Sequence, residues 1–393
     1  MKNTKIGKLI INSQVSLAPM AGITDYVLRS LVRRHSKSCL LTTEMISSEA
    51  LVQVPETSIL KRNYGAKNQS PSRHCETFDS NVEGIIPPKQ SPSSLNISPF
   101  SNGLPQDAQE ITSVVCCRPS TSLMSRNDVE DADHSPIAYQ LSGHKPQLMA
   151  RAAKMLEPYA DIIDINMGCP VNKVVKGQDG CALMRNPELA FDVVRAIKAE
   201  VELPVSVKFR LGYTVNELNF VEYGVKMQEA GADFITIHGR TRSQMYSGKA
   251  DWASIKELKR NVDIPVFANG DILSIESAIE CLEQSNADGV AVGRGVLGDV
   301  TLIARIEHYL MTGEKLPVPS LEEKVQTLKT HLIEEMNLRR EDVGIKFVRK
   351  FYPYYISGIK DAAKYRAMLV REDDYDKIIK VLDELANLKL VMQ

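Results

Sequence analysis

Between residues 136 and 310 the sequence alternates regularly between short apolar runs and longer amphipathic segments, and this rhythm limits the possible folds more than any other feature. The apolar runs predict buried strands, and the segments between them predict helices. Strands that are connected by helices pair in parallel. The predicted strands here are 137–141, 162–165, 204–210, 234–238, 264–269 and 289–293, and the predicted helices are 147–159, 187–201, 220–230, 252–260, 274–282 and 302–310.

Two further predicted strands, 15–20 and 40–46, precede this region, and a helix from Thr24 to His35 separates them. Eight strands, each followed by a helix or a crossover, are typical of the (β/α)8 TIM barrel. A doubly wound α/β sheet is the alternative, although such a sheet usually contains fewer units. We therefore expect a TIM barrel formed by residues 1–60 and 136–315.

The composition changes on both sides of these boundaries. Residues 61–135 are rich in Ser, Pro, Asn and Asp and lack apolar periodicity. Such a segment cannot bury enough apolar surface to offset the entropy of ordering, so we expect a flexible insertion. After Pro319 the pattern predicts an all-helical domain over 320–393, with helices at 321–338, 343–355, 361–369 and 375–388.

The overall composition is that of an ordinary globular protein, with 43% hydrophobic residues, 25% charged residues and a net charge of −1. The seven cysteines lack metal-ligand spacing, so we expect free thiols in a reducing cytoplasm and no metal site. No apolar run approaches the roughly 18 residues of a membrane helix, and the first residues lack the apolar core of a signal peptide. We expect a cytoplasmic monomer without membrane association.

Each predicted strand ends in polar or conformationally unusual residues, at the end where a TIM barrel carries its active site. One such residue alone would be a turn or capping residue, but eight strands out of eight exceed what turns require. The glycines and the arginine of the last two loops suit a phosphate. The residues are Pro19-Met20-Ala21, Glu44, Gln140, Asn166 with Cys169, Lys208 with Arg210, His238, Asn269-Gly270-Asp271 and Gly293-Arg294-Gly295.

Cys169 follows a strand that breaks into the turn sequence Asn-Met-Gly-Cys-Pro. Its position between Gly168 and Pro170 indicates a stiff, exposed loop, whereas core cysteines usually lie inside apolar runs. We expect the nearby Lys173 to lower the pKa of the thiol, so that the sulfur can exchange a proton. A structural role as a small turn residue is the alternative that these residues leave open.

Basic and aromatic residues alternate within the predicted helical domain. A solvated helical bundle would explain the charges alone, but cations beside tyrosines are also typical of a nucleic-acid surface. We expect these cations to serve RNA and not a small-molecule site. They include Arg339, Arg340, Lys346, Arg349, Lys350, Tyr352, Tyr354, Tyr355, Lys360 and Lys364.

Together, six stretches resemble the tRNA-dihydrouridine synthases, flavin enzymes that reduce uridine in tRNA, and most closely their bacterial branch. They occur in the order of that family, within residues 9–62 and 136–360. The insertion departs from the family pattern, and so does Cys181, where the family often has Ser or Ala; we treat Cys181 as structural. The stretches are Ala18–Asp25, Asn166–Pro170, Val207–Arg210, Ile237–Arg242, Ala268–Ile272 and Gly293–Gly295.

The resemblance implies FMN as the cofactor, NADPH or NADH as its reductant and tRNA as the partner. Cys169 would protonate uracil C5 after a hydride reaches C6, and the uridine would have to leave the tRNA fold to reach the flavin. The implied flavin contacts are Pro19, Met20 and Ala21 behind the ring, Gln140 and Lys208 at its polar edge, His238 beside it, and Asn269, Gly270, Asp271, Gly293 and Arg294 at the ribityl phosphate. The predicted RNA contacts are Lys173, Arg349 and Lys350.

Two other functions are compatible with parts of this pattern. One is an FMN barrel oxidoreductase for a small pyrimidine, such as a dihydroorotate dehydrogenase; the basic, aromatic helices argue against it. The other is a catalytically silent RNA-binding protein, against which the intact Cys169, Lys208 and His238 argue. Purified protein without flavin absorbance would favour the silent protein.

Overall fold

The computed structural model describes residues 3–53 and 134–388, which belong to one compact unit. The predicted insertion at 61–135 therefore lies outside the described residues, apart from its last two positions. One of these, His134, is buried; its ring lies 4.7 Å from that of Tyr26, and its Nε2 lies 2.9 Å from the Ser30 hydroxyl. His134 thus packs against α1 of the barrel, although the composition assigns it to the insertion.

All eight predicted strands are present and parallel. Neighbours pair in chain order from β6 to β11, and β11 pairs with β3. The N–H of Leu17 donates to the carbonyl of Leu40 at 2.8 Å, so the two ends of the sheet meet. The strands are β3 (Val15–Leu17), β4 (Leu41–Thr42), β6 (Ile137–Ser142), β7 (Ile162–Asn166), β8 (Val205–Arg210), β9 (Phe234–His238), β10 (Val266–Asn269) and β11 (Gly289–Val292).

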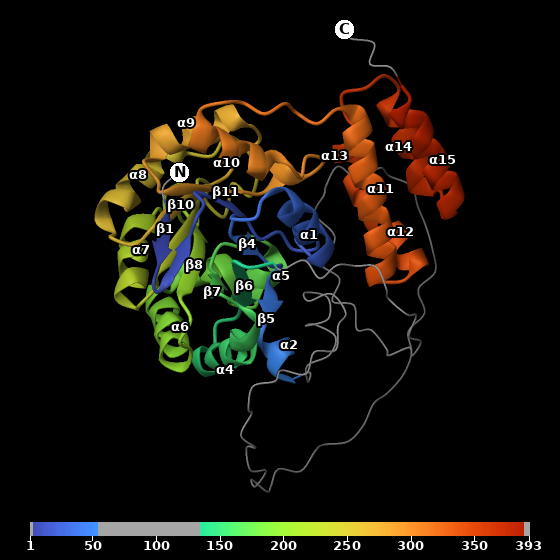
Figure 1. Ribbon diagram of the computed structural model, residues 1–393. Helices are drawn as coiled ribbons and strands as arrows, with labels where there is room; N and C mark the ends of the chain where they lie inside the picture. Colours follow the sequence, from blue (N-terminus) through green and yellow to red (C-terminus); the bar gives the residue numbers. More distant parts are fainter. Residues whose placement is uncertain (1–2, 54–133, 389–393) are drawn as a thin grey trace, which may run out of the picture. The chain divides into compact units, whose positions relative to one another are not determined.

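The helices surround these strands, as Figure 1 shows. α1 begins where the Asp25 side chain accepts the N–H of Leu28, which is the capping expected of an aspartate at this position. The TIM barrel is therefore confirmed. Its helices are α1 (Tyr26–His35), α2 (Ser48–Gln53), α4 (Pro146–Leu156), α6 (Pro187–Glu200), α7 (Phe220–Glu229), α8 (Trp252–Asn261), α9 (Ile275–Ser285) and α10 (Leu302–Thr312).

Several short elements differ from the sequence prediction. The predicted strand at 40–46 is divided, because β5 (Ile46–Ser47) follows β4 after a break and pairs with β6 further along. The antiparallel hairpin of β1 and β2 was not predicted, nor were α2, α5 and the 3-10 helices. These are β1 (Thr4–Ile6), β2 (Leu9–Ile11), α5 (Asn172–Lys176), η1 (Glu157–Tyr159), η2 (Gly180–Arg185) and η3 (Arg294–Val296).

The barrel interior begins with an apolar floor at the N-terminal ends of the strands. Ile162, Phe234 and Phe267 pack there against Ile6 and Ile11 of the N-terminal hairpin. The two phenylalanine rings meet edge to face, with 4.9 Å between their centroids. The alternate residues of each strand, such as Val205, Val207 and Phe209 on β8, belong to the separate core under the helices.

A helical region follows the barrel, as predicted. α11 packs against α12, α15 and α1 of the barrel. The predicted helix at 343–355 consists of three consecutive segments. The predicted division into a barrel domain, formed by residues 1–60 and 136–315, and a separate helical domain, formed by residues 320–393, stays a prediction. The elements are α11 (Leu321–Leu338), α12 (Glu341–Val348), η4 (Arg349–Phe351), α13 (Tyr352–Tyr355), α14 (Ala362–Arg371) and α15 (Tyr375–Ala386).

Within residues 3–53 and 134–388, no helix combines the length and the apolar character that crossing a bilayer requires.

Candidate active site at the mouth of the barrel

A chain of hydrogen bonds connects β6, β7 and β8 inside the barrel. Gln140 donates through Nε2 to Asp164 Oδ2 at 2.6 Å, and the Ser206 hydroxyl donates to Asp164 Oδ1 at 2.5 Å. The amide of Asn166 donates to Gln140 Oε1 at 2.8 Å. The parallel register brings these side chains together, because it places Gln140 opposite Asp164 and Asp164 opposite Ser206. Burial raises the pKa of Asp164 to about 6 against the opposing effect of these bonds.

Lys208 lines a small cavity inside the barrel, together with Asp164 and Ser206 of this network and the floor residue Phe234. Among the described residues, none accepts a hydrogen bond from its ammonium group. Burial and the neighbouring Arg210 lower the pKa of Lys208 to about 8, whereas Asp164 opposes that shift. Lys208 therefore presents to this interior cavity a cation that has no acceptor within residues 3–53 and 134–388.

The loop that carries Cys169 is fixed from several sides. Asn166 Oδ1 accepts the N–H of Gly168 at 3.2 Å and that of Cys169 at 2.9 Å. Arg210 Nε donates to the carbonyl of Gly168 at 2.9 Å, and the N–H of Cys181 donates to the carbonyl of Cys169 at 3.1 Å. Cys169 is partly exposed, whereas the other cysteines in the described part of the chain are buried. The loop thus holds one accessible thiol in a defined position.

The predicted cause and direction of the shift in the Cys169 pKa are wrong. Burial raises this pKa, and the cations that oppose the rise are Arg210 and Lys208. Lys173 instead lies exposed on α5. Burial wins because it disfavours the thiolate. A thiol that keeps its proton near neutral pH is suited to donate that proton and not to act as a ready nucleophile.

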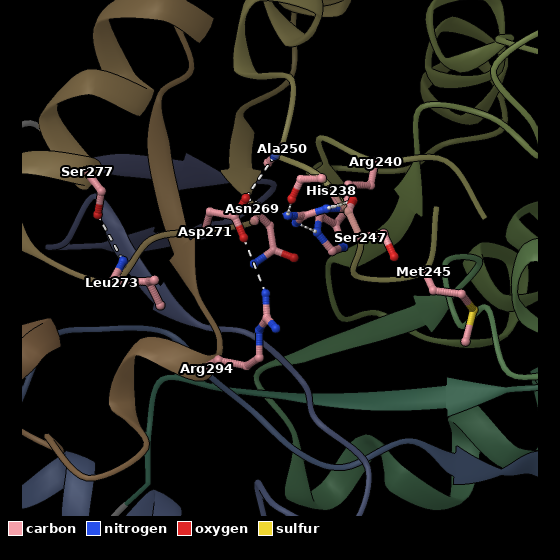
Figure 2. Close-up of polar contacts among 12 residues, drawn as sticks. His238, Arg240, Met245, Ser247, Ala250, Asn269, Asp271, Leu273, Ser277 and Arg294 are labelled. Atoms are coloured by element: carbon pink, nitrogen blue, oxygen red, sulfur yellow. Dashed lines mark hydrogen bonds and ion pairs between the residues drawn. The ribbon is translucent and has the colours of Figure 1, made fainter. Parts of the chain in front are cut away.

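Arg240 joins the loop after β9 to the loop after β10, as Figure 2 shows. Its guanidinium is buried and donates to Asp271 Oδ2 at 2.6 Å, to the carbonyl of Gly248 at 2.6 Å and to that of Ser247 at 3.0 Å. It also lies 3.3 Å from Nε2 of His238. Burial and the surrounding cations hold the pKa of His238 well below its usual range, so the imidazole stays neutral.

Asp271 orients arginines at the predicted phosphate end of the site. Besides Arg240, its carboxylate accepts from Arg294 Nη2 at 3.3 Å and from the N–H of Ala250 at 2.8 Å. A carboxylate engaged in this way would repel a phosphate, so we assign its side chain to holding Arg294 in place. Arg294 remains half-exposed at the mouth and can meet an anion.

Gly293 lies close to residues of two neighbouring strand ends at the same end of the site. A Cβ added there would meet nothing closer than Met20 Sδ at 3.8 Å, with Ala18 and the Asn269 amide at 4.0 Å. The ends of β3, β10 and β11 therefore bring Met20, Asn269 and Gly293 close together, while their contact with a cofactor stays a prediction. Asn269 is held by a bond from its Nδ2 to the carbonyl of Ala291 at 2.7 Å.

Sequence reasoning assigned no role to Arg240, Asp164 or Ser206. The signal for Asp164 was available, because an acidic residue within the apolar run Ile162–Ile165 needs a buried partner. Arg240 belongs to a recognised motif, but its role became apparent only from the two loops that it joins. Ser206 is an inward-facing polar residue of a strand with an apolar outer face, and alternation could have indicated it.

The predicted RNA-contact residues have different surroundings. Lys173 is exposed. Arg349 donates to Asp373 Oδ1 at 2.5 Å and to the carbonyl of Glu372 at 3.1 Å. Lys350 instead donates to the carbonyl of Gly22, in the loop after β3. Contact of these residues with RNA stays a prediction.

Comparison with known proteins agrees with this geometry. The family model described as "Dihydrouridine synthase (Dus)" matches residues 16–73 and 108–389. A probable tRNA-dihydrouridine synthase 1 of Synechocystis sp. is 34% identical over 384 residues, which cover 98% of this chain and 89% of that protein. A probable tRNA-dihydrouridine synthase of Rickettsia bellii is 34% identical over 98% of this chain and 99% of its own length. The tRNA-dihydrouridine synthase B of Pseudomonas aeruginosa is 37% identical over 63% of this chain and 75% of its own length.

The matched residues include every strand of the barrel from Ser16 on and the helices that follow it up to residue 389. They also include the loop of Cys169, the cation of Lys208 and the arginine pair at Asp271. The chain belongs to the dihydrouridine synthase family, a family of flavin-dependent oxidoreductases.

Proposed function

We propose that this protein reduces the C5–C6 double bond of uridine in tRNA, with FMN as the cofactor and NADPH, or NADH, as the reductant. One observation carries the proposal: the loop after β7 fixes the Cys169 thiol near the cations Lys208 and Arg210 of β8. The names of the relatives supply the substrate class. A proton donor close to a cation is the arrangement that reduction of a polarised double bond requires.

The residues present fit FMN. Lys208 offers a cation without a protein acceptor, and Gln140 offers a polar amide for the edge of the flavin ring. Met20 and Gly293 lie near each other, and Gly293, which has no side chain, would leave the backbone accessible to the ring and the ribityl chain. Arg294 would bind the phosphate, with Gly293 allowing close approach of the backbone. Pro19 and Ala21 would complete the support behind the ring, and Asn269 and Gly270 would border the ribityl chain.

FMN would supply the hydride for uracil C6. Cys169 would then donate the thiol proton to C5, and the raised pKa of this thiol keeps that proton available at neutral pH. Asn166 would hold the donor in place through the backbone of the Cys169 loop. Lys208 would bind the electron-rich edge of the cofactor, while neutral His238 would offer a hydrogen bond beside it without adding charge.

Dihydrouridine formation on an unmodified tRNA transcript tests this proposal. We expect the purified protein to absorb visible light as a flavoprotein and to form dihydrouridine when NADPH is added. Cys169→Ala should retain flavin and lose about 10²- to 10⁴-fold in turnover, the usual contribution of a general acid. Cys281→Ala is the matched control, because Cys281 is buried in α9.

The competing functions predict other results. A flavoprotein that reduces a free pyrimidine and leaves tRNA unchanged would contradict the proposed substrate. A protein that binds tRNA but carries no flavin would contradict the enzymatic function. Turnover of Cys169→Ala close to that of the wild type would leave the family assignment intact but would remove Cys169 as the proton donor.

We also propose that Lys173 and Arg349 contact tRNA phosphates, since the mouth alone is too small to orient a folded tRNA. Each phosphate contact that is lost should reduce the salt dependence of tRNA affinity by about one unit of slope. Affinities of Lys173→Ala and Arg349→Ala measured across a salt series test these contacts. Slopes equal to that of the wild type would exclude both residues.

A further inference from the structure

The C-terminal helices hold the loop that follows β3. Lys350, in η4, donates a hydrogen bond to the carbonyl of Gly22. The N–H of Gly22 donates to Glu44 Oε1 of the barrel. Three residues further on, Asp25 Oδ2 accepts from Arg339 Nη2 at 2.6 Å, at the end of α11. One short loop is thus held by two cations that lie more than 300 residues away in the sequence.

Both cations are themselves held in position. The ring of Phe347 in α12 lies 3.1 Å from Lys350 Nζ and 3.7 Å from Arg339 Cζ, measured to the ring centroid. Cation–π contacts of this kind strengthen when they are shielded from water. The carboxyl groups of Asp25, Glu335 and Glu44 face Lys350. Lys350 is therefore placed by its surroundings and is not a mobile surface lysine.

The held loop behaves as one turn. The carbonyl of Met20 accepts the N–H of Ile23 at 3.0 Å and that of Thr24 at 2.9 Å, and the N–H of Met20 donates to the Thr24 hydroxyl at 3.0 Å. A shift of Gly22 would therefore move Met20. Met20 Sδ lies 3.8 Å from the position of a Cβ added at Gly293, at the end of the site where we place the flavin. The contacts of Lys350 and Arg339 thus reach the cofactor site through a single turn of chain.

We propose that Lys350 and Arg339 are positioning residues for the flavin, because they fix the Met20–Gly22 loop against which the cofactor rests. The C-terminal helices then serve the redox site as well as RNA, in contrast to the expectation from their composition alone. This inference rests on the proposed flavin-dependent function. It assigns a cofactor-retention role to a lysine that the sequence associates with RNA.

Lys350→Met tests the proposal in the holoprotein, because the Met side chain can still pack on Phe347 but cannot donate to Gly22. We expect FMN to bind about tenfold more weakly or worse, as for the loss of a charge-assisted hydrogen bond. The visible circular dichroism of the remaining bound flavin should change, and Lys350→Arg should restore both properties. Arg339→Gln should shift flavin retention in the same direction, and it serves as the second variant if Lys350→Met folds poorly.

Lys346→Ala is the matched control, since Lys346 is an exposed cation of the same helical segment. It should retain flavin as the wild type does. Unchanged FMN affinity and unchanged visible circular dichroism in both Lys350→Met and Arg339→Gln would overturn the inference, whatever happens to tRNA affinity. Wild-type protein that binds no FMN would overturn the proposed function as well, so the two failures are distinguishable.

Discussion

The floor and the mouth of the barrel are built by the same strands, yet they bury opposite kinds of side chain. On β7 the inward-facing residue is Ile162 at the floor and Asp164 two positions further on. On β9 it is Phe234 at the floor and then Thr236 and His238. Two residues along a strand, or about 7 Å, thus separate apolar packing from ionisable groups.

This difference indicates that the floor stabilises the fold, whereas the mouth holds the groups available for binding and catalysis. The floor gains free energy from close apolar packing. The mouth buries charge at a cost, which is visible in the raised pKa of Asp164 and the lowered pKa of Lys208. A ligand that pairs with these groups can recover part of that cost. We therefore expect changes at the floor to affect folding and changes at the mouth to affect binding and catalysis.

A large truncation at the floor tests the first half of this comparison. Phe267→Ala removes a fully buried ring that packs against Phe234 and should lower the free energy of unfolding by about 3–5 kcal/mol. Urea denaturation measures the loss. The protein that remains folded should retain its flavin. Phe267→Leu should lose less, because it leaves a smaller cavity, and a loss of flavin without a loss of stability would contradict the division.

The matching change at the mouth is Lys208→Met. This variant removes the cation that faces the cavity, so flavin affinity should fall by roughly 10- to 100-fold, which corresponds to about 1.5–3 kcal/mol for a hydrogen bond to a charged group. Stability without flavin should stay equal or rise, since a buried charge is removed. Flavin titration and urea denaturation of the same samples measure both quantities. Destabilisation comparable to that of Phe267→Ala would show that Lys208 is structural.

The sequence predicts the barrel well because its signals are local. The strand at Ile162–Ile165, the helix predicted from Thr24 to His35 and the helix at Leu321–Leu338 all have the predicted type and nearly the predicted ends. The break between β4 and β5 could not be predicted, because residues 40–46 form an almost continuous strand-like pattern. The N-terminal hairpin was missed because each of its strands has only three residues.

The site was predicted only in part, because its properties depend on distant contacts. Lys208, Cys169 and Gly293 were predicted as site residues because they lie at or just after the ends of predicted strands. Parallel strands bring their C-terminal ends to one edge. The direction of the Cys169 pKa shift depends on burial, which neighbours in the sequence do not reveal. The contact of Lys350 with Gly22 joins residues that are 328 positions apart, and no periodicity in the sequence indicates it.

The rim of the mouth contains a pair of carboxyl groups. Because these groups ionise, their contribution to stability should depend on pH, unlike that of the apolar floor. Asp25 and Glu335 are both buried and share Arg339, which lies 2.6 Å from Asp25 and 2.7 Å from Glu335. Burial and the charge of Asp25 raise the pKa of Glu335. Burial alone would raise the pKa of Asp25 too, but the hydrogen bond from Glu335 and the charge of Arg339 lower it. The pair therefore holds one proton, on Glu335.

This proton makes stability depend on pH with a defined sign. Above the ordinary pKa of glutamate, 4.5, the unfolded chain releases the proton while the folded protein keeps it. The folded state then binds more protons, so the free energy of unfolding falls as pH rises. Glu335→Gln removes this dependence, because a glutamine amide can donate to Asp25 and accept from Arg339 without ionising.

As the pH rises from 5 to 8, we expect the stability of Glu335→Gln to increase relative to that of the wild type by up to about 4 kcal/mol, because one proton contributes about 1.4 kcal/mol per pH unit. Urea denaturation at the two pH values measures the gain, and the exposed Glu384→Gln on α15 should show none. Phe267→Ala should lose the same free energy at both pH values, because that ring packs within an apolar cluster. If the free energy of unfolding of Glu335→Gln instead changed with pH as that of the wild type does, the carboxyl pair would not hold a proton. The rim and the floor would then not differ in pH dependence at this position.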